Sequence, residues 1–212
     1  MIATKLRTIG SQISSLKSRE AVLQAAVLLD AASGKSTLAM IPLPDHLAAR
    51  FPAGEYRPHI TLCYITSGDQ TPGMTSQLMM AMRRAANAVR PFRIMADTNA
   101  GLQEFGDGDD GTKALWFGVL DRPEDALAKL HYAIKLSLLD EKLPCDDSHP
   151  KYTPHITWTY VPNDIAEKDR NRHDAVAASR FTDTPLAFAV NSFCLALPDG
   201  TVKPVLLNPN AK

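Results

Sequence analysis

The chain has 212 residues, the size of one domain or of a compact two-lobed one, and 45% of them are hydrophobic and 22% charged. These ordinary globular proportions exclude a disordered or collagen-like chain. The 23 Lys and Arg balance the 23 Asp and Glu, so the formal net charge is zero. We therefore expect no duplex nucleic acid as a partner, because non-specific binding to a duplex needs a broad basic face.

Cysteine usage and apolar runs indicate where the protein resides. Cys63, Cys145 and Cys194 lie far apart and form no C-x-x-C pair, which favours reduced thiols over a disulfide framework or a zinc cluster. No apolar run approaches the roughly 18 residues that a membrane span needs. Charged residues just before the apolar stretch 21–29 make it a poor signal peptide. We expect a cytoplasmic protein that makes no contact with a membrane.

The first half of the chain reads as a helix followed by alternating strands and helices. Apolar residues at helical spacing predict a helix over 11–32, and Gly34 stands where a helix stop is expected. The next elements are, in order, a strand over 37–41, a short helix over 45–51, a strand over 56–65 and a helix over 76–89.

The second half repeats this rhythm. The predicted elements are strands over 92–105 and 114–120, a helix from Pro123 to about 139, a strand over 152–161 and a closing hairpin of 186–197 with 201–207. Residues 162–184 are polar and charged and are expected to form a loop with at most one helical turn. Strands alternating with helices, twice over, predict an α/β or α+β fold with sheets flanked by helices.

One nine-residue pattern, Y-x-P-H-I-T-x-x-Y, occurs twice, over 56–64 and over 152–160. Its histidines, His59 and His155, are 155 − 59 = 96 residues apart. Composition alone would produce P-H-I-T only about 0.0014 times in a chain of this kind, so chance explains two copies poorly. The copies fall on predicted strands at matching places in the two halves, which indicates a duplicated unit with pseudo-twofold symmetry.

The spacing within the repeat predicts which side chains share a face. Alternate residues of a strand point the same way, so His59 points with Thr61, and His155 points with Thr157. The opposite face is expected to carry core residues, namely Ile60, Leu62, Tyr64, Ile156, Trp158 and Tyr160.

Two such strands related by a pseudo-dyad can bring two imidazoles and two hydroxyls into one cleft. Histidine exchanges protons readily near neutral pH, so a pair on opposite sides of a phosphorus supplies the base and the acid of an in-line displacement. Threonine hydroxyls can donate hydrogen bonds to the non-bridging oxygens. This scheme requires no metal. A lone strand histidine is more often a structural residue; it is the duplication that favours the functional interpretation.

The paired P-H-I-T motifs resemble those of the two-histidine (2H) phosphoesterase superfamily, whose members include LigT-like RNA 2′,5′-ligase/cyclic phosphodiesterases. The resemblance covers roughly 37–207. It implies an α+β fold in which two antiparallel β-sheet lobes face each other across a central cleft, with helices outside. It also implies that His59 and His155 are the acid/base pair, that Thr61 and Thr157 contact the phosphate, and that no cofactor is needed.

The resemblance further implies a metal-independent phosphodiesterase. Its substrate would be a nucleotide 2′,3′-cyclic phosphate or a short 2′,5′- or 3′,5′-linked oligonucleotide, linear or cyclic. Some phage members of the family act on cyclic oligonucleotide signals of anti-phage defence, which adds such a signal to the candidates. Two alternatives remain open: a non-catalytic nucleotide-binding module with the same fold, and RNA 2′,5′-ligase activity.

Residues 1–35 lie ahead of the family's first strand. They are expected to form a helical extension that mediates oligomerisation or assembly. Residues 36–212 would then form a single bilobal domain with repeats over about 36–92 and 93–212.

Residues beside the two motifs are candidates for substrate binding. Tyr56 and Tyr152 precede each histidine by three residues and could stack on a nucleobase; aromatic packing at the start of the strand is the alternative, and it is slightly favoured. Arg57 and Lys151 could steer a phosphate, although exposed surface charges are commoner.

Structural interpretations suffice for the other features. Gly34 to Thr37 lacks the earlier glycine of a phosphate-binding P-loop, and Asp107, Asp109 and Asp110 lack calcium-loop spacing. No metal site is expected, because His149, Cys145 and His155 do not show a metal-ligand spacing. Trp116 and Trp158 are expected in the core, and His46, His131 and His173 at the surface or on helices.

Overall fold

The computed structural model describes residues 37–53, 57–65, 72–105, 111–123, 125–143, 145, 151–197 and 201–211. The helix expected over 11–32, the polar turn at 34–36, the acidic loop around Asp109, and the residues Tyr56 and His149 lie outside the described residues.

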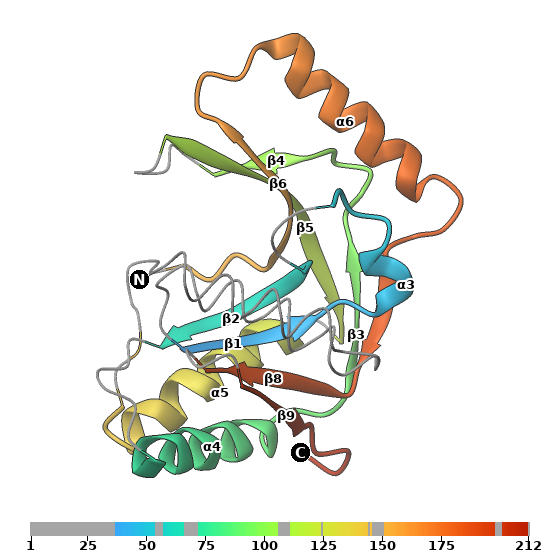
Figure 1. Cartoon of the computed structure of the whole chain (residues 1–212). Coiled ribbons are helices and arrows are strands. Elements are labelled where there is room, and N and C mark those ends of the chain that lie inside the picture. Colours follow the sequence, from blue (N-terminus) through green and yellow to red (C-terminus); the bar gives the residue numbers. More distant parts are fainter. Residues whose placement is uncertain are drawn as a thin grey trace, which may run out of the picture.

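Strands and helices alternate along the described chain (Figure 1). In order they are β1 (Thr37–Pro42), α3 (Asp45–Ala48), β2 (His59–Ile65), α4 (Pro72–Ala86), β3 (Phe92–Ala96), β4 (Gln103–Glu104), β5 (Thr112–Arg122), α5 (Ala126–Asp140), β6 (His155–Pro162), α6 (Glu167–Phe181), β7 (Ala187–Val190), β8 (Ser192–Ala196) and β9 (Val202–Leu206).

The described strands form two antiparallel sheets. The first sheet has the order β2-β1-β8-β9, and the second has the order β4-β5-β3-β7, with β6 also paired to β5. Helices α4 and α5 lie side by side below the first sheet, and α6 lies at the far end of the molecule, beside the second sheet (Figure 1). The predicted α+β fold of two antiparallel β-sheet lobes with helices outside is confirmed.

The two halves of the chain repeat the same order of elements and the same strand register. Each half runs strand, helix, strand, helix, strand, as β1-α3-β2-α4-β3 and as β5-α5-β6-α6-β7. In the first half His59 lies opposite Pro42, and in the second His155 lies opposite Gly118. Both registers shift shortly after the threonine, at Leu62 and at Trp158. The internal repeat in the sequence therefore corresponds to a repeat in the backbone.

This shared β-bulge corrects the prediction for the two tyrosines that end the motifs. An extra residue in one strand breaks the alternation of faces, so Cys63 rather than Tyr64 faces the core after the bulge. Tyr64 is half-buried, and Tyr160 is 51% exposed. The expectation that these tyrosines belong to the core was wrong. It is confirmed for the other four residues of that face, Ile60, Leu62, Ile156 and Trp158.

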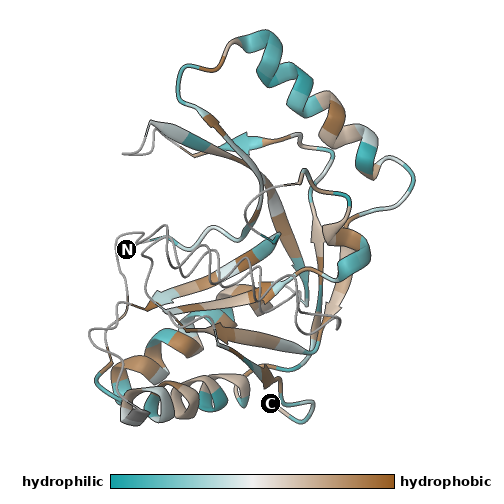
Figure 2. Ribbon diagram, in the orientation of Figure 1, coloured by the Kyte–Doolittle hydropathy of each residue, from teal (hydrophilic) through white to brown (hydrophobic). Residues whose placement is uncertain are grey.

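The segment 162–184 contains a full helix, α6, where a loop was expected. It buries only Ala177 and Phe181 and is otherwise largely hydrophilic (Figure 2), so it shows no broad apolar stripe. Phe181 fastens the helix to the main core, with its ring 5.5 Å from that of Phe117. Glu167 in the first turn and Arg180 in the last turn interact favourably with the helix dipole.

The expected strand over 186–197 is divided at Asn191. Before this residue β7 pairs with β3 of the second sheet, and after it β8 pairs with β1 of the first sheet. Only β8 and β9 form the predicted hairpin. The bend thus joins the two sheets, and the Asn191 carbonyl accepts a hydrogen bond from Leu207 N at 2.9 Å. None of the described helices is long and apolar enough to cross a membrane.

Candidate active site

Each motif histidine is the first residue of its strand, because a proline precedes it. Proline has no N–H to give to a strand ladder, so pairing begins at the next residue. The carbonyls of Pro58 and Pro154 still accept hydrogen bonds, from Leu43 N at 3.1 Å and from Val119 N at 3.2 Å. Both histidines are therefore held at equivalent strand ends.

The two imidazoles are oriented in the same way. The Nδ1 of His59 lies 2.8 Å from the Arg57 carbonyl oxygen, and the Nδ1 of His155 lies 2.8 Å from the Thr153 carbonyl oxygen. A carbonyl oxygen only accepts, so Nδ1 carries the proton in both rings. The neutral ring then has its lone pair on Nε2, and this is the nitrogen suited to accept a proton from a substrate.

The threonine of each motif lies on the same sheet face as its histidine. Thr61 pairs with Met40 and Thr157 with Trp116, one step before each bulge. Both threonines are half-buried. Strands β2 and β6 are in contact, although they belong to different sheets. The structure therefore brings the strands that carry the four predicted catalytic residues side by side.

Tyr152 and His131 fasten these two strands together. The Tyr152 hydroxyl donates to the Thr61 carbonyl at 3.2 Å, and Nδ1 of His131 lies 2.6 Å from the Leu62 carbonyl. Their rings stack at 4.2 Å with an interplanar angle of 6°. We call this pair the Tyr152–His131 clamp. The alternative left open for Tyr152, aromatic packing, matches these contacts. His131, expected at the surface or on a helix, lies on α5 and is only 8% exposed.

Burial is the main cause that raises the pKa of Tyr152 above its usual range, and Coulombic repulsion from the Asp121 carboxylate and, once it is ionised, from Cys63 adds to it. The phenol therefore stays protonated, as its role of hydrogen-bond donor to β2 requires.

Two aromatic residues, Phe105 and Trp116, pack beside His155. The Phe105 ring stacks on Trp116 at 4.7 Å and meets His155 edge-on at 4.7 Å. Trp116 is 6% exposed, as expected of a core residue, yet it lies on the face of Thr157 and outside the main core cluster. Phe105 is 37% exposed. Phe105 was not among the predicted site residues, because a single aromatic residue before a Gly/Asp-rich loop carries no distinctive pattern.

Arg57 and Lys151 differ in their surroundings. Lys151 is exposed. The Arg57 side chain is 11% exposed, forms an ion pair with Asp45 and donates to the Leu43 carbonyl at 2.7 Å. Arg57 is therefore not a surface charge. Both contacts are made by Nη2, and Nε is buried without a hydrogen-bond partner among the described residues.

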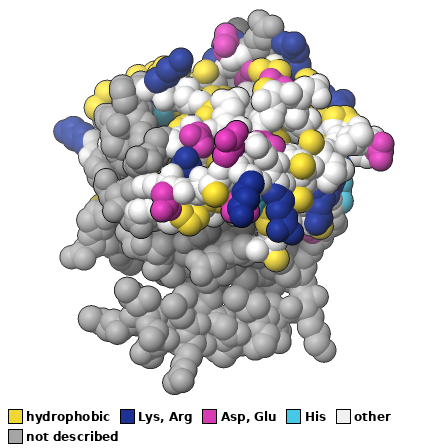
Figure 3. Space-filling model, turned by 90° about the horizontal axis from the view of Figure 1, so that it is seen from above, with side chains coloured by type: hydrophobic (Ala, Val, Ile, Leu, Met, Phe, Trp, Pro, Cys, Tyr) yellow, Lys and Arg dark blue, Asp and Glu magenta, His cyan; other side chains and the backbone are white. Residues whose placement is uncertain are grey.

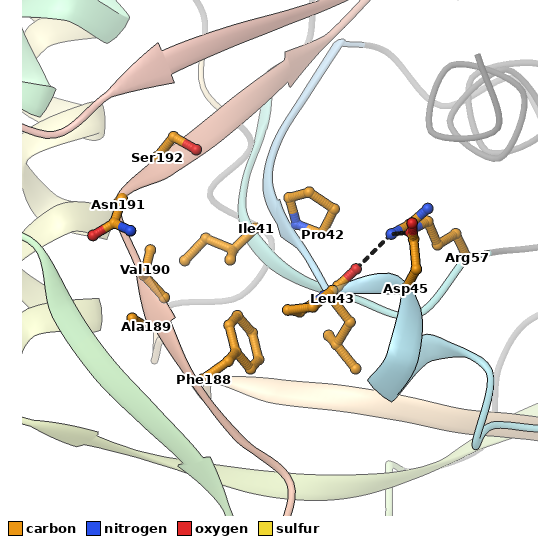
Figure 4. Close-up of a pocket in the computed structure, with 11 residues that line it drawn as sticks. Ile41, Pro42, Leu43, Asp45, Arg57, Phe188, Ala189, Val190, Asn191 and Ser192 are labelled. Atoms are coloured by element: carbon orange, nitrogen blue, oxygen red, sulfur yellow. Dashed lines mark hydrogen bonds and ion pairs between the residues drawn. The ribbon is translucent and has the colours of Figure 1, made fainter. Parts of the chain in front are cut away.

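A pocket of about 470 Å³ lies beside Arg57, where the end of β1 meets the bend between β7 and β8 (Figure 4). Pro42, which pairs with His59, lines it, so it adjoins the strand end that carries this histidine. Apolar side chains line much of it, and its polar groups come from Asp45, Arg57, Asn191 and Ser192.

On the face seen in Figure 3, acidic and basic side chains are intermingled. Within the described ranges, no three His, Cys, Asp or Glu residues cluster in a way that could hold a metal ion.

Several known proteins resemble the chain. Usb1 from Kluyveromyces marxianus, solved with uridine monophosphate, is 11% identical with a TM-score of 0.52, over 82% of this chain and 100% of that chain. E. coli LigT complexed with 3′-AMP is 16% identical with a TM-score of 0.48, over 82% and 95% of the two chains. At these identities the likeness shows the fold alone. No curated protein matches the sequence.

A protein-family model also matches the chain. Residues 45–201 fit the family model of the 2′-5′ RNA ligase superfamily, and these 201 − 45 + 1 = 157 residues are more than half of the chain. The fit includes both H-x-T motifs, so the predicted resemblance to the 2H phosphoesterases is confirmed. The chain belongs to the 2′-5′ RNA ligase superfamily.

Proposed function

We propose that the protein is a metal-independent phosphodiesterase that acts on a small nucleotide or a short oligonucleotide in the cytoplasm. The observation that carries this proposal is the matched pair of histidines. Each begins a strand of the repeat, and each has its Nδ1 hydrogen-bonded to the carbonyl two residues earlier. In both halves this contact leaves the lone pair of the neutral ring on Nε2, the nitrogen that would exchange a proton with a substrate.

The chemistry follows from this pair. One histidine accepts, at Nε2, the proton of the nucleophile, which is water or a ribose 2′-hydroxyl, as the new P–O bond forms. The other histidine, protonated, gives its proton to the departing oxygen as the old P–O bond breaks. Thr61 and Thr157 donate to the non-bridging oxygens, where negative charge builds up. Because both imidazoles are held alike, the position of the leaving oxygen decides which one acts as the acid.

The pocket beside Arg57 supports a substrate of nucleotide size. Its volume of about 470 Å³ lies within the range typical of small-molecule sites, roughly 300–1,000 Å³. Apolar walls suit a base, and the Asn191 and Ser192 side chains can form hydrogen bonds to a base or a ribose. The related fold of Usb1 was solved with uridine monophosphate, which also favours a nucleotide. We therefore assign the pocket to the nucleoside next to the scissile phosphate.

One panel of substrates tests this proposal. The protein is incubated in EDTA with 2′,3′-cyclic mononucleotides and with linear and cyclic di- and trinucleotides, including cyclic oligonucleotides of the kind used as defence signals. The products are identified by mass spectrometry. We expect hydrolysis of at least one class, with the activity lost in the His59→Ala, His155→Ala double variant.

The other outcomes of the panel are informative too. Activity that disappears in EDTA would contradict the proposal. Tight binding of a nucleotide by calorimetry without any product would favour the non-catalytic module. The name of the family favours ligation as a second candidate, which would appear as joining of a 5′-hydroxyl oligonucleotide to a cyclic phosphate end.

A further inference from the structure

Two of the three cysteines, far apart in the sequence, lie in contact. The Sγ atoms of Cys63 and Cys145 are 3.0 Å apart across 82 residues of chain. Cys63 lies on β2, two residues after Thr61, and Cys145 lies between α5 and β6. Both sulfurs also approach the Tyr64 carbonyl oxygen, at 3.3 Å and 3.9 Å.

The distance suits a disulfide better than a metal. A disulfide is about 2.05 Å long, so the two sulfurs need to approach by only about 1 Å. Two thiolates on one tetrahedral zinc, at about 2.3 Å each, would lie about 3.8 Å apart, which is farther than the observed 3.0 Å.

The two thiols differ in how accessible they are. Cys63 is 4% exposed and faces the core, whereas Cys145 is half-buried at the edge of the same cluster. An oxidant from solution would therefore meet Cys145 first, and Cys63 would be the resolving thiol behind it. Cysteines in this arrangement, an accessible one next to a resolving partner, are typical of reversible redox sites.

The third cysteine provides an internal comparison. Cys194 on β8 is buried, and burial raises its pKa to about 11, although Arg57 acts in the opposite sense. Because the thiolate is the reactive form, Cys194 is expected to stay inert near neutral pH.

We propose that Cys63 and Cys145 form a redox modification site that closes to a reversible disulfide when it meets a small-molecule disulfide such as glutathione disulfide. The Cys145 thiolate attacks one sulfur of the oxidant, whose S–S bond breaks and releases one glutathione thiolate. Cys63, having lost its proton to water, then attacks the Cys145 sulfur and displaces the second glutathione. Two protein thiols are oxidised, and one glutathione disulfide is reduced to two glutathione molecules.

The disulfide would link β2 covalently to Cys145, which precedes β6 in the chain. Strand β2 is fixed by its pairing with β1 and by the Tyr152–His131 clamp, whereas Cys145 lies outside any helix or strand, so we expect Cys145 to move toward Cys63. The positions of His59 and Thr61 then change little. We therefore expect oxidation to stabilise the fold and to leave turnover, where it is measured, within about threefold of that of the reduced protein. The proposed disulfide does not depend on the proposed function.

The experiment uses the full chain in EDTA, equilibrated with mixtures of reduced and oxidised glutathione. Peptide mapping should identify a Cys63–Cys145 disulfide and an unmodified Cys194, reversed by dithiothreitol. The melting temperature of the oxidised form should rise by roughly 5–10 °C. The matched control Cys194→Ser should behave like the natural chain, and Cys145→Ser, at the half-buried position, should show neither the cross-link nor the shift.

The proposal is overturned by a Cys145–glutathione adduct that Cys63 never resolves, or by a cross-link involving Cys194. It is also overturned if Cys145→Ser shows the same rise in melting temperature. If zinc added without EDTA protects both thiols and binds in stoichiometric amount, the pair is a metal site instead. None of these readouts needs a substrate, so they are independent of the phosphodiesterase proposal.

Discussion

The hydrogen bonds to Nδ1 are the observation at the residue scale that supports the proposed acid–base pair. They fix the same tautomer at His59 and His155, so either ring can accept or donate at Nε2. The threonines two residues later share this face and have hydroxyls that match the charge that develops on a phosphate.

The threonine hydroxyls give a prediction of their own. Thr61→Val and Thr157→Val keep the shape of the side chain and remove the donor, so each should lower kcat by about 100-fold, the usual cost of losing one donor to a developing oxyanion. Steady-state kinetics with a substrate found in the panel measures this. Thr→Ser at either position should restore most of the rate, and an unchanged kcat in both valine variants would exclude the role.

The pocket beside Arg57 is tested at Ser192, a partly exposed residue on its lining. Ser192→Phe places a ring at the pocket and should raise KM about tenfold, which corresponds to roughly 1.4 kcal/mol of lost binding, with kcat within about twofold.

The control for this variant is Ala178→Phe, at an exposed alanine on α6 away from the pocket, and it should leave both constants unchanged. Equal KM values for the two variants would show that the nucleoside does not occupy the pocket.

Among the elements, β2 and β6 matter most, because they carry the site from two different sheets. The Tyr152–His131 clamp holds them together through consecutive carbonyls of β2. Its partners come from α5 and from the segment before β6, so the clamp depends on the whole arrangement of the second half.

Removing one hydroxyl tests the clamp. Tyr152→Phe keeps the stack on His131 and loses the hydrogen bond to Thr61 O, so the free energy of unfolding should fall by about 1 kcal/mol. Urea denaturation measures it, and Tyr132→Phe, at an exposed ring, should change it by less than about 0.5 kcal/mol.

The pH dependence of stability gives a second readout of the clamp. The pKa of Tyr152 is raised in the folded state above its ordinary value of 10.0, so the unfolded chain ionises first. The contribution of Tyr152 is therefore complete below pH 10 and is lost as the pH rises beyond it. Stability should fall less steeply above pH 10 in Tyr152→Phe than in the natural chain, and equal slopes would contradict a buried, protonated phenol.

Local patterns predicted most of the elements and the shared strand faces of the four motif residues. The repeat is local, its alternation of faces holds up to the threonine, and strands rich in Ile and Thr flanked by prolines are easily recognised. The same alternation failed at Tyr64 and Tyr160, because a one-residue bulge cannot be read from the sequence of a single strand.

Other features depend on contacts that no local pattern contains. Helix α6 is polar and is fastened by Phe181 at its end, so periodicity did not indicate it. The clamp between Tyr152 and His131, the packing of Phe105 and Trp116, and the pair of Cys63 and Cys145 all join residues distant in sequence. The bend at Asn191 follows from the placement of two sheets, which only the complete fold determines.

For the whole molecule, zero net charge and the pocket beside Arg57 fit one type of ligand. Acidic and basic groups are intermingled on the face shown in Figure 3, and the proposed site relies on imidazoles and hydroxyls rather than on a basic surface. These features suit the short nucleotide that we propose as the substrate.

The organisation of the chain is testable by truncation. If residues 1–35 are an assembly element attached to a domain of 36–212, a chain that begins at residue 34 should keep its turnover while its mass by light scattering falls to that of the monomer. An unchanged number of subunits per particle would exclude the assembly role. Loss of both folding and turnover would show that the extension is part of the domain.

The most direct test of the central claim is turnover by His59→Ala, His155→Ala and the double variant, in EDTA, on the best substrate of the panel. The account predicts that each single variant loses about 100- to 10,000-fold in kcat, with circular dichroism unchanged. The double variant should be little worse than the poorer single one, because acid and base act in the same step. Full activity in the double variant would contradict the account.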